Sequence, residues 1–153
     1  MVITFCGHSN YVSDSKDEER LLNYLETVLQ GSYVEFYLGG YGGFDDFAFK
    51  CAKKYKRKHK NVKLVFITPY LGEWLNKRKD YIEERYDEII YPDIENVPLR
   101  FAISKRNEWM IKKADYVVGY VKTHYGGAYK MLLYARKQKK QYINLYQGEY
   151  ELY

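Results

Sequence analysis

Short apolar runs alternate along the chain with longer amphipathic segments. The apolar runs predict strands at residues 2–6, 34–38, 63–68, 89–91, 116–121 and 142–145. The segments between them predict helices at about 16–30, from 44 or 45 to beyond 55, and at 73–86, 101–114 and 126–139. Strands that alternate with helices in this way are typical of βαβ units and of a parallel sheet.

Local signals mark the ends of the first helix. Asp14 and Ser15 are capping candidates at its start, and Gly31 is a stop signal beyond its end. Its apolar stripe consists of Leu21, Leu22, Leu25, Val28 and Leu29. The segment 73–86 is by contrast highly charged, so we expect it to lie outside the sheet layer. No repeat, linker or low-complexity segment interrupts the pattern, and residues 1–153 are expected to form a single domain.

The predicted fold class is α/β, a Rossmann-like open and mostly parallel sheet with helices on both faces. In such a sheet the ligand site lies beyond the carboxyl ends of the strands, at a topological switch point. Three turns fall at these ends, at residues 7–10, 39–45 and 123–128. We therefore expect the three turns to converge on one ligand site.

Composition narrows the location and the chemistry. No stretch approaches the ~20 apolar residues of a membrane span, and the first residues lack the basic region of a signal peptide. We expect a cytoplasmic protein with no membrane partner. Cys6 and Cys51 show no CxxC spacing, so reduced thiols are expected. His8, His59 and His124 have no ligand-like spacing with Cys or acids, and no metal site is predicted.

The net charge of +5 raises the alternative of a nucleic-acid partner. The basic residues concentrate in segments 53–63 and 136–140, each at the predicted end of a helix and just beyond it. Cations at that end are stabilised by the helix dipole without any partner. We therefore favour solvated helix ends, and nucleic-acid binding remains possible but is not favoured.

The strongest candidate for ligand binding is the first glycine turn, residues 39–43. Gly39, Gly40, Gly42 and Gly43 surround Tyr41 between a predicted buried strand and a helix. Glycines let a ligand approach backbone N–H groups, and the helix N-terminus adds about half a positive charge. One glycine would suffice for a tight turn, so four favour a phosphate site.

Two familiar phosphate motifs are excluded. A P-loop requires GxxxxGK[ST], and no Lys-Ser or Lys-Thr follows these glycines. A dinucleotide fingerprint requires an acid at the end of the next strand, which here ends in Ile67-Thr68-Pro69. NAD or FAD is therefore disfavoured, and no cofactor is predicted.

Other polar residues flank the strand ends. Asp45 is either a capping residue or a carboxylate that binds a ribose hydroxyl or a base amine. Arg106 and Asn107 could hold a phosphate and a ribose, although an exposed helical Arg is the simpler interpretation. His8 and Ser9 could contact a ligand or act as acid and base, but no triad accompanies them. The second glycine turn, residues 125–128, contributes Gly126, Gly127 and Ala128 at the start of another helix.

Three blocks of the sequence resemble the SLOG superfamily, named for the Smf/DprA and LOG proteins, and within it the YpsA-like (DUF1273-type) group of small bacterial proteins. The blocks are Gly7-His8-Ser9, the run from Gly39 through Gly43-Phe44-Asp45-Asp46 to Ala48, and the run from Arg106-Asn107 through Ala114-Asp115 to Gly126-Gly127-Ala128. The resemblance implies a Rossmann-like fold with a nucleotide-type ligand over the strand ends. It also implies that Phe44, Asp45, Arg106 and Asn107 belong to the ligand site, together with the glycines.

The chain departs from the hydrolytic branch of that superfamily. That branch is similar to PGGxGTxxE, with a catalytic glutamate one turn into the helix, whereas Lys130, Met131 and Leu132 occupy this region here. Glycosidic hydrolysis requires a carboxylate at the reacting carbon. We therefore expect a nucleotide sensor or binding module. The alternative is a nucleotide N-glycosidase with Asp45 as its carboxylate, and the resemblance is compatible with a homo-oligomer.

Overall fold

The computed structural model describes residues 1–153 as one six-stranded sheet with five α-helices and a short 3-10 helix. Along the chain the elements are β1 (Val2–Gly7), α1 (Ser15–Leu29), β2 (Val34–Leu38), α2 (Gly42–Lys58), β3 (Val62–Ile67), α3 (Glu73–Arg85), β4 (Glu88–Ile90), η1 (Leu99–Phe101), α4 (Ala102–Lys113), β5 (Tyr116–Tyr120), α5 (Gly126–Lys137) and β6 (Gln141–Asn144).

All neighbouring strands are parallel, in the order β4-β3-β2-β1-β5-β6. The chain proceeds from β1 outward to β4 and then returns to the other side of β1 to form β5. The order therefore reverses between β1 and β5, where Cys6 pairs with Gly119 and Gly7 with Tyr120. This is the topological switch point at which parallel α/β sheets bind ligands.

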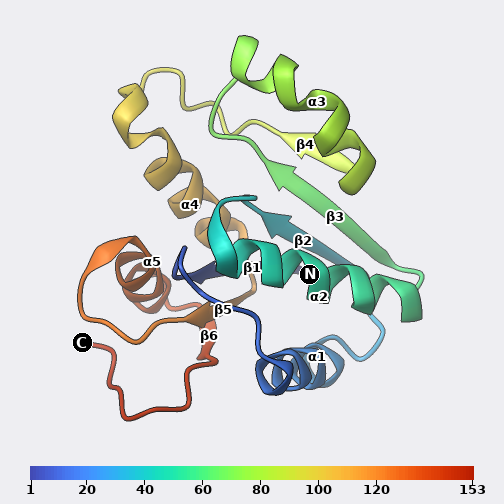
Figure 1. The fold of residues 1–153 in the computed structure, drawn as a ribbon, viewed down its shortest axis with the longest axis vertical. Coiled ribbons are helices and arrows are strands. Elements are labelled where there is room, and N and C mark those ends of the chain that lie inside the picture. Colours follow the sequence, from blue (N-terminus) through green and yellow to red (C-terminus); the bar gives the residue numbers. More distant parts are fainter.

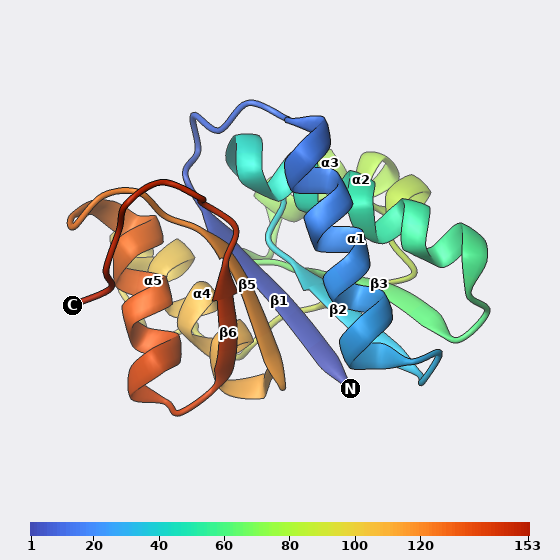
Figure 2. The ribbon, with the colours of Figure 1, turned by 90° about the horizontal axis from the view of Figure 1, so that it is seen from below.

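Helices cover both faces of the sheet, which confirms the predicted fold class. Helices α1 and α2 lie on one side and α4 and α5 on the other (Figure 2). The largest core cluster joins the first pair to the sheet through Leu21, Leu25, Phe44 and Phe47 against Ile3 and Phe36. A smaller cluster joins α5 to β5 through Met131, Leu132 and Val117.

Helix α3 is held more loosely than the others. It lies at the β4 end of the sheet (Figure 1), and Ile82 is its only buried residue. Pairs of opposite charge along its surface, Glu73 with Lys77 and Lys79 with Glu83, support the helix locally. The charged pattern that set this segment apart in the sequence thus corresponds to a helix with little apolar contact.

The element boundaries agree with the predictions within a few residues, and one difference concerns the site. Asp14 caps α1 by accepting hydrogen bonds from the N–H groups of Lys16 and Asp17. Helix α2, however, begins at Gly42 rather than at Phe44 or Asp45, so two of the predicted turn glycines belong to its first turn. None of the helices combines the length and the apolar character that crossing a bilayer requires.

Candidate functional site

A cleft of about 580 Å³ opens at the switch point, between the ends of β1 and β5 and the start of α5. We call it the strand-end cleft. Its volume falls within the roughly 300–1,000 Å³ of small-molecule sites. The predicted site residues that line it are Gly7, His8, Ser9, Asp45, Arg106, Asn107, Gly126, Gly127 and Ala128. These residues come from β1 and the loop that follows it, and from α2, α4 and α5, so the three turns converge as the topology predicts.

The remaining predicted residues do not line this cleft. Gly39, Gly40, Gly42 and Gly43 lie in the first glycine turn, away from the cleft wall. Phe44 is completely buried in the core, where its ring packs on those of Tyr11 and Tyr120. The side chain of Phe44 is therefore not exposed to the strand-end cleft, and its contact with a ligand stays a prediction from the resemblance. Its ring fills the space beside Gly7, where a Cβ would come 2.2 Å from the Phe44 Cγ atom.

The first glycine turn is closed by the loop that follows β1. The N–H of Gly43 donates to the carbonyl of Ser9 at 2.7 Å, and the N–H of Phe44 donates to the carbonyl of His8 at 3.3 Å. The N–H of Tyr41 donates to the Asp45 carboxylate at 2.9 Å. A Cβ on Gly43 would lie 2.1 Å from the Tyr11 carbonyl oxygen. Packing therefore explains the glycine, and the N–H groups of Gly43 and Phe44 are already bonded within the protein.

The second glycine turn is open. Gly126 has a φ of +87°, and a Cβ on Gly126 or Gly127 would meet nothing within 4 Å. No protein group accepts a hydrogen bond from the N–H groups of Gly126, Gly127 or Ala128, and no side chain caps α5. Lys122 also lines the cleft. Free N–H groups, the positive end of a helix dipole and a lysine together suit an anion such as a phosphate.

Arg106 differs from the exposed helical residue that the sequence alone favoured. It is only 1% exposed, and its Nη1 donates to the carbonyls of Ile67 at 2.7 Å and Gly39 at 3.1 Å. Its Nε donates to the Asn107 side chain at 2.8 Å. The guanidinium thus joins the ends of β2 and β3. Arg106 also lines the strand-end cleft, and its Nη2 makes no hydrogen bond within the protein.

Asp45 lies half-buried in the cleft wall, one turn into α2. Burial raises the pKa of its carboxyl to about 6, and the hydrogen bond from Tyr41 and the charge of Arg106 limit that rise. Burial of the Arg106 guanidinium lowers its pKa, and the negative charge of Asp45 limits that decrease. A carboxyl whose pKa approaches neutrality in a cleft is typical of functional sites, although structural networks produce the same shift.

His8 connects the end of β1 to Lys122, which lies two residues beyond the end of β5. The N–H of Lys122 donates to its Nε2 at 3.0 Å, which places the imidazole proton on Nδ1. Burial lowers the pKa of His8, and the nearby charge of Lys122 lowers it further. His8 is therefore neutral at pH 7 and can offer its Nδ1–H to a ligand.

Segment 146–153 fixes the loop before α5 from outside the cleft. The ring of His124 lies between those of Tyr150 and Tyr153, with centroids 4.7 and 4.5 Å away. The hydroxyl of Tyr150 donates to the Thr123 carbonyl at 2.6 Å, and the His124 Nε2 bonds the Glu151 carbonyl at 2.6 Å. This segment holds the second glycine turn in place without entering the cleft.

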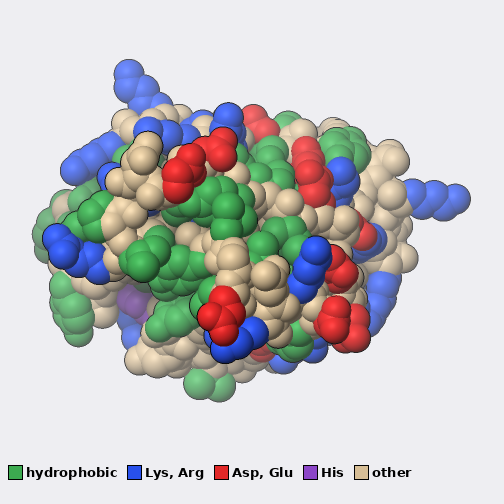
Figure 3. Space-filling model, turned by 90° about the horizontal axis from the view of Figure 1, so that it is seen from above, with side chains coloured by type: hydrophobic (Ala, Val, Ile, Leu, Met, Phe, Trp, Pro, Cys, Tyr) green, Lys and Arg blue, Asp and Glu red, His purple; other side chains and the backbone are tan.

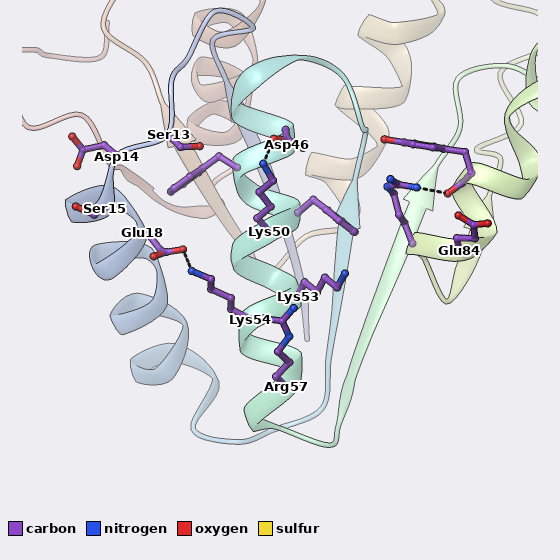
Figure 4. Close-up of a pocket in the computed structure, with 14 residues that line it drawn as sticks. Ser13, Asp14, Ser15, Glu18, Asp46, Lys50, Lys53, Lys54, Arg57 and Glu84 are labelled. Atoms are coloured by element: carbon purple, nitrogen blue, oxygen red, sulfur yellow. Dashed lines mark hydrogen bonds and ion pairs between the residues drawn. The ribbon is translucent and has the colours of Figure 1, made fainter.

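A larger groove, of about 710 Å³, lies over α2 between α1 and α3. Figure 4 shows Lys50, Lys53, Lys54 and Arg57 along α2, with Glu18 extending from α1 toward Lys54. Lys50 and Lys54 are paired with Asp46 and Glu18. The groove has side chains of both signs and no cluster of free backbone N–H groups, so its volume alone does not make it the better candidate.

Neither a family model nor a curated protein matches this chain. The family resemblance proposed from its motifs therefore stays a prediction. The structure also contains no group of three or more His, Cys, Asp or Glu side chains that could hold a metal ion.

Sequence reasoning missed several residues of the strand-end cleft. Lys122 lies two residues beyond the end of β5, and the rule that places ligands beyond strand ends could have identified it. Ile103 and Met131 form part of an apolar wall. They carry no sequence signal beyond helical periodicity, because a residue that faces a cleft and one that faces the core have the same spacing.

Proposed function

We propose that this protein binds a nucleotide or a nucleotide-derived ligand in the strand-end cleft, as a sensor or binding module. The observation that carries the proposal is the second glycine turn, where three consecutive N–H groups at the start of α5 have no partner in the protein. A ligand phosphate there would accept hydrogen bonds from these groups and would be stabilised by the helix dipole and by Lys122.

The rest of the cleft supports a ligand larger than phosphate. Ile103 and Met131 offer apolar contact, and Asn107 and His8 offer polar groups that could fix a sugar or a base. The resemblance to the SLOG superfamily points to the same ligand class and the same edge of the sheet. The first glycine turn contributes only Tyr41 and the nearby Asp45 to the wall of the strand-end cleft. The proposal therefore depends on the second glycine turn and on the volume of the cleft.

A second candidate is a nucleotide N-glycosidase, which the position and the raised pKa of Asp45 favour. Such an enzyme requires a carboxylate near the bond that breaks. The first turn of α5 contains no acidic residue, so Asp45 would have to serve. If Asp45 is catalytic, nucleoside monophosphates incubated with the protein release free base, and Asp45→Asn abolishes the release.

Nucleic-acid binding through the basic segments is less well supported. In segment 53–63, Lys54 pairs with Glu18, Lys56 with Asp87 and Lys63 with Glu88. In segment 136–140, Arg136 donates to the carbonyl of Leu152 and Lys140 donates to that of Lys112. The acidic partners neutralise three cations of segment 53–63, and the carbonyl contacts hold two side chains of segment 136–140 against the protein. Weak DNA affinity without a steep salt dependence would exclude this alternative.

Self-association is a further proposal for the partners of this chain. Exposed apolar side chains lie in the connections that lead from the strands into the next helices, namely Val12, Tyr41, Leu71, Leu99 with Phe101 in η1, and Tyr125. Figure 3 shows hydrophobic side chains gathered across the middle of the face above α3 and β4, between scattered charges. Exposed apolar patches of this kind are typical of interaction surfaces, and sedimentation measurements would test the proposal.

The nucleotide proposal is tested by thermal denaturation with adenosine 5′-monophosphate (AMP), ADP-ribose and cyclic dinucleotides. A ligand at 100 times its Kd stabilises the folded state by about 2.7 kcal/mol. In Gly127→Asp the added Cβ meets nothing within 4 Å, and the carboxylate favours the start of α5 but repels an anion there. We expect this variant to fold and to lose the ligand-induced shift.

Ser15→Asp is the matched control. It adds the same charge to the exposed first turn of α1, away from the strand-end cleft, and should retain the shift. The absence of a shift with every nucleotide, or equal shifts in the two variants, would contradict the proposal.

A further inference from the structure

A smaller cavity of about 250 Å³ lies on the opposite side of the first glycine turn from the strand-end cleft. We call it the aromatic cavity. Asp45 lines both cavities, whereas Gly40 and Gly42 line only the aromatic cavity. The volume is below the roughly 300 Å³ at which sites for whole small molecules begin. It therefore suits a single ring system rather than a complete nucleotide.

The floor of the aromatic cavity consists of rings. Phe66 and Phe49 each pack against Tyr86, with ring centroids 5.2 and 5.1 Å apart. These three side chains come from β3, α2 and the residue after α3, so the floor joins the sheet to both helices. A planar ligand that enters here would meet aromatic surface, on which any heterocyclic ring can stack.

The wall on α3 combines aromatic rings with cations. The guanidinium of Arg78 lies 4.4 Å from the ring centroid of Trp74, and that of Arg85 lies 3.5 Å from that of Tyr81. Both pairs line the aromatic cavity. Because α3 is anchored by a single buried residue, Ile82, this wall can adjust to a ligand with little loss of core contact.

Two polar groups in the aromatic cavity remain available for recognition. The hydroxyl of Tyr86 makes no hydrogen bond in the protein, and it lies 3.6 Å from where a Cβ on Gly40 would be. Asp45 uses Oδ2 for the N–H of Tyr41, which leaves Oδ1 free. A hydroxyl and a carboxylate beside aromatic rings are the groups that recognise the edge of a nucleobase, since they pair with a ring nitrogen and an exocyclic amine.

We propose that the aromatic cavity is the base subsite for the ligand of the strand-end cleft, and that it takes a nucleobase with an exocyclic amine. This inference rests on the proposed function. The phosphate lies on the second glycine turn, the sugar passes Asp45 beside Gly40 and Gly42, and the base stacks between Phe66, Tyr86 and the α3 wall. The carboxylate of Asp45 accepts the hydrogen bond from the amine, which uracil cannot supply.

The protein contains two tryptophans, which makes the base subsite directly observable. Trp74 lines the aromatic cavity, whereas Trp109 lies on α4 and stacks on Tyr37. In Trp109→Phe, which keeps an aromatic ring on Tyr37, Trp74 is the only indole reporter. We expect AMP to quench its fluorescence. Ribose 5-phosphate should bind, as measured by calorimetry, without quenching.

Affinity measurements complete the test. Stacking on an aromatic side chain contributes enough that Trp74→Leu should weaken AMP binding by roughly tenfold or more, with ribose 5-phosphate unaffected. Cytidine 5′-monophosphate should bind more tightly than uridine 5′-monophosphate, from which it differs at the amine position. Binding of both AMP and ribose 5-phosphate with no response from Trp74, and no effect of Trp74→Leu, overturns this inference alone. Failure of both ligands to bind contradicts the proposed function and this inference with it.

Discussion

The two Tyr-Gly-Gly turns of this protein share their sequence and their local geometry but differ in what surrounds them. In each, an extended tyrosine, Tyr41 or Tyr125, precedes a glycine with a φ of +87° at the start of a helix. The first turn is packed against the loop after β1, whose carbonyls bond the N–H groups of α2. In the second turn a Cβ on either glycine would meet nothing within 4 Å, and the N–H groups of Gly126, Gly127 and Ala128 are free.

This difference shows that a glycine motif specifies a backbone shape but not whether its donors are available. Availability is decided by a third segment, the loop of residues 8–11, which lies against one turn and not the other. The same tripeptide is therefore a structural joint at the end of β2, and after β5 it leaves free the donors that the proposed ligand site requires. Substitutions in and around the two turns separate these two roles.

Arg106→Met tests whether this arginine belongs to the structural joint. The variant leaves the buried carbonyls of Gly39 and Ile67 without their donor, and each unsatisfied group costs about 1–3 kcal/mol. We expect the free energy of unfolding in urea to fall by about 3 kcal/mol. Lys105→Met, at an exposed neighbour paired with Glu108, should change it by less than about 0.5 kcal/mol. Equal, small effects would mean that Arg106 is not part of the scaffold.

Paired glycine substitutions compare the two turns directly. Gly43→Ala brings a Cβ to 2.1 Å from a backbone carbonyl and should cost about 2–3 kcal/mol. A Cβ on Gly127 has open space around it, so Gly127→Ala should stabilise the protein by less than about 1 kcal/mol. Chemical denaturation measures both. The contrast between the turns would be lost if the two variants were destabilised to a similar extent.

Asp45 gives the first turn a pH dependence that the second lacks. Burial raises the pKa of Asp45 to about 6 from an ordinary 3.8, so the folded protein binds this proton more tightly than the unfolded chain. The contribution of Asp45 therefore favours folding at low pH and is lost as pH rises from about 4 through 6. Above pH 7, the buried carboxylate is a constant cost.

We expect Asp45→Asn to be more stable than the parent protein by about 1–2 kcal/mol at pH 7.5 and no more stable at pH 4. Asp46→Asn, at the exposed neighbour that pairs with Lys50, is the control and should show little difference between the two pH values. An Asp45→Asn variant that loses stability at pH 7.5 would indicate that the carboxylate is instead a stabilising cap.

His124→Ala tests the support of the second turn from outside. It removes the ring between Tyr150 and Tyr153 and one hydrogen bond to segment 146–153, at a cost of about 0.5–1.5 kcal/mol. We expect weaker ligand binding, measured as a smaller ligand-induced thermal shift. His59→Ala, at a distant histidine that pairs with Glu26, should leave that ligand-induced shift unchanged. Unchanged ligand affinity in His124→Ala would show that the second turn keeps its shape without this segment.

The sequence predicted the fold well because the fold depends on signals that are local. Alternating strands and helices, the Asp14 cap and the stop at Gly31 each act within a few residues, and the parallel topology followed from their order. The approximate site followed as well, since parallel strands end at one edge of the sheet.

The predictions failed where the outcome depends on distant contacts. Nothing near Gly43 in sequence reveals that the Tyr11 carbonyl occupies the space beside it. Likewise, Arg106 has the spacing of an ordinary helical residue, and only the assembled sheet shows that it joins two strand ends. Phe44 was expected at the ligand because of its motif, but helical periodicity already placed it on the buried face of α2.

We expect an anion to bind the second glycine turn and not the first. The most direct measurement is a titration of the ¹⁵N-labelled protein with inorganic phosphate, which has no sugar or base to pass the first turn, followed through the backbone amide resonances of both turns. The largest chemical-shift changes are expected at Gly126, Gly127 and Ala128, with Gly43 and Phe44 almost unchanged because their N–H groups stay bonded to Ser9 and His8. Large changes at Gly43 and Phe44 with silent resonances at Gly126–Ala128 would contradict it.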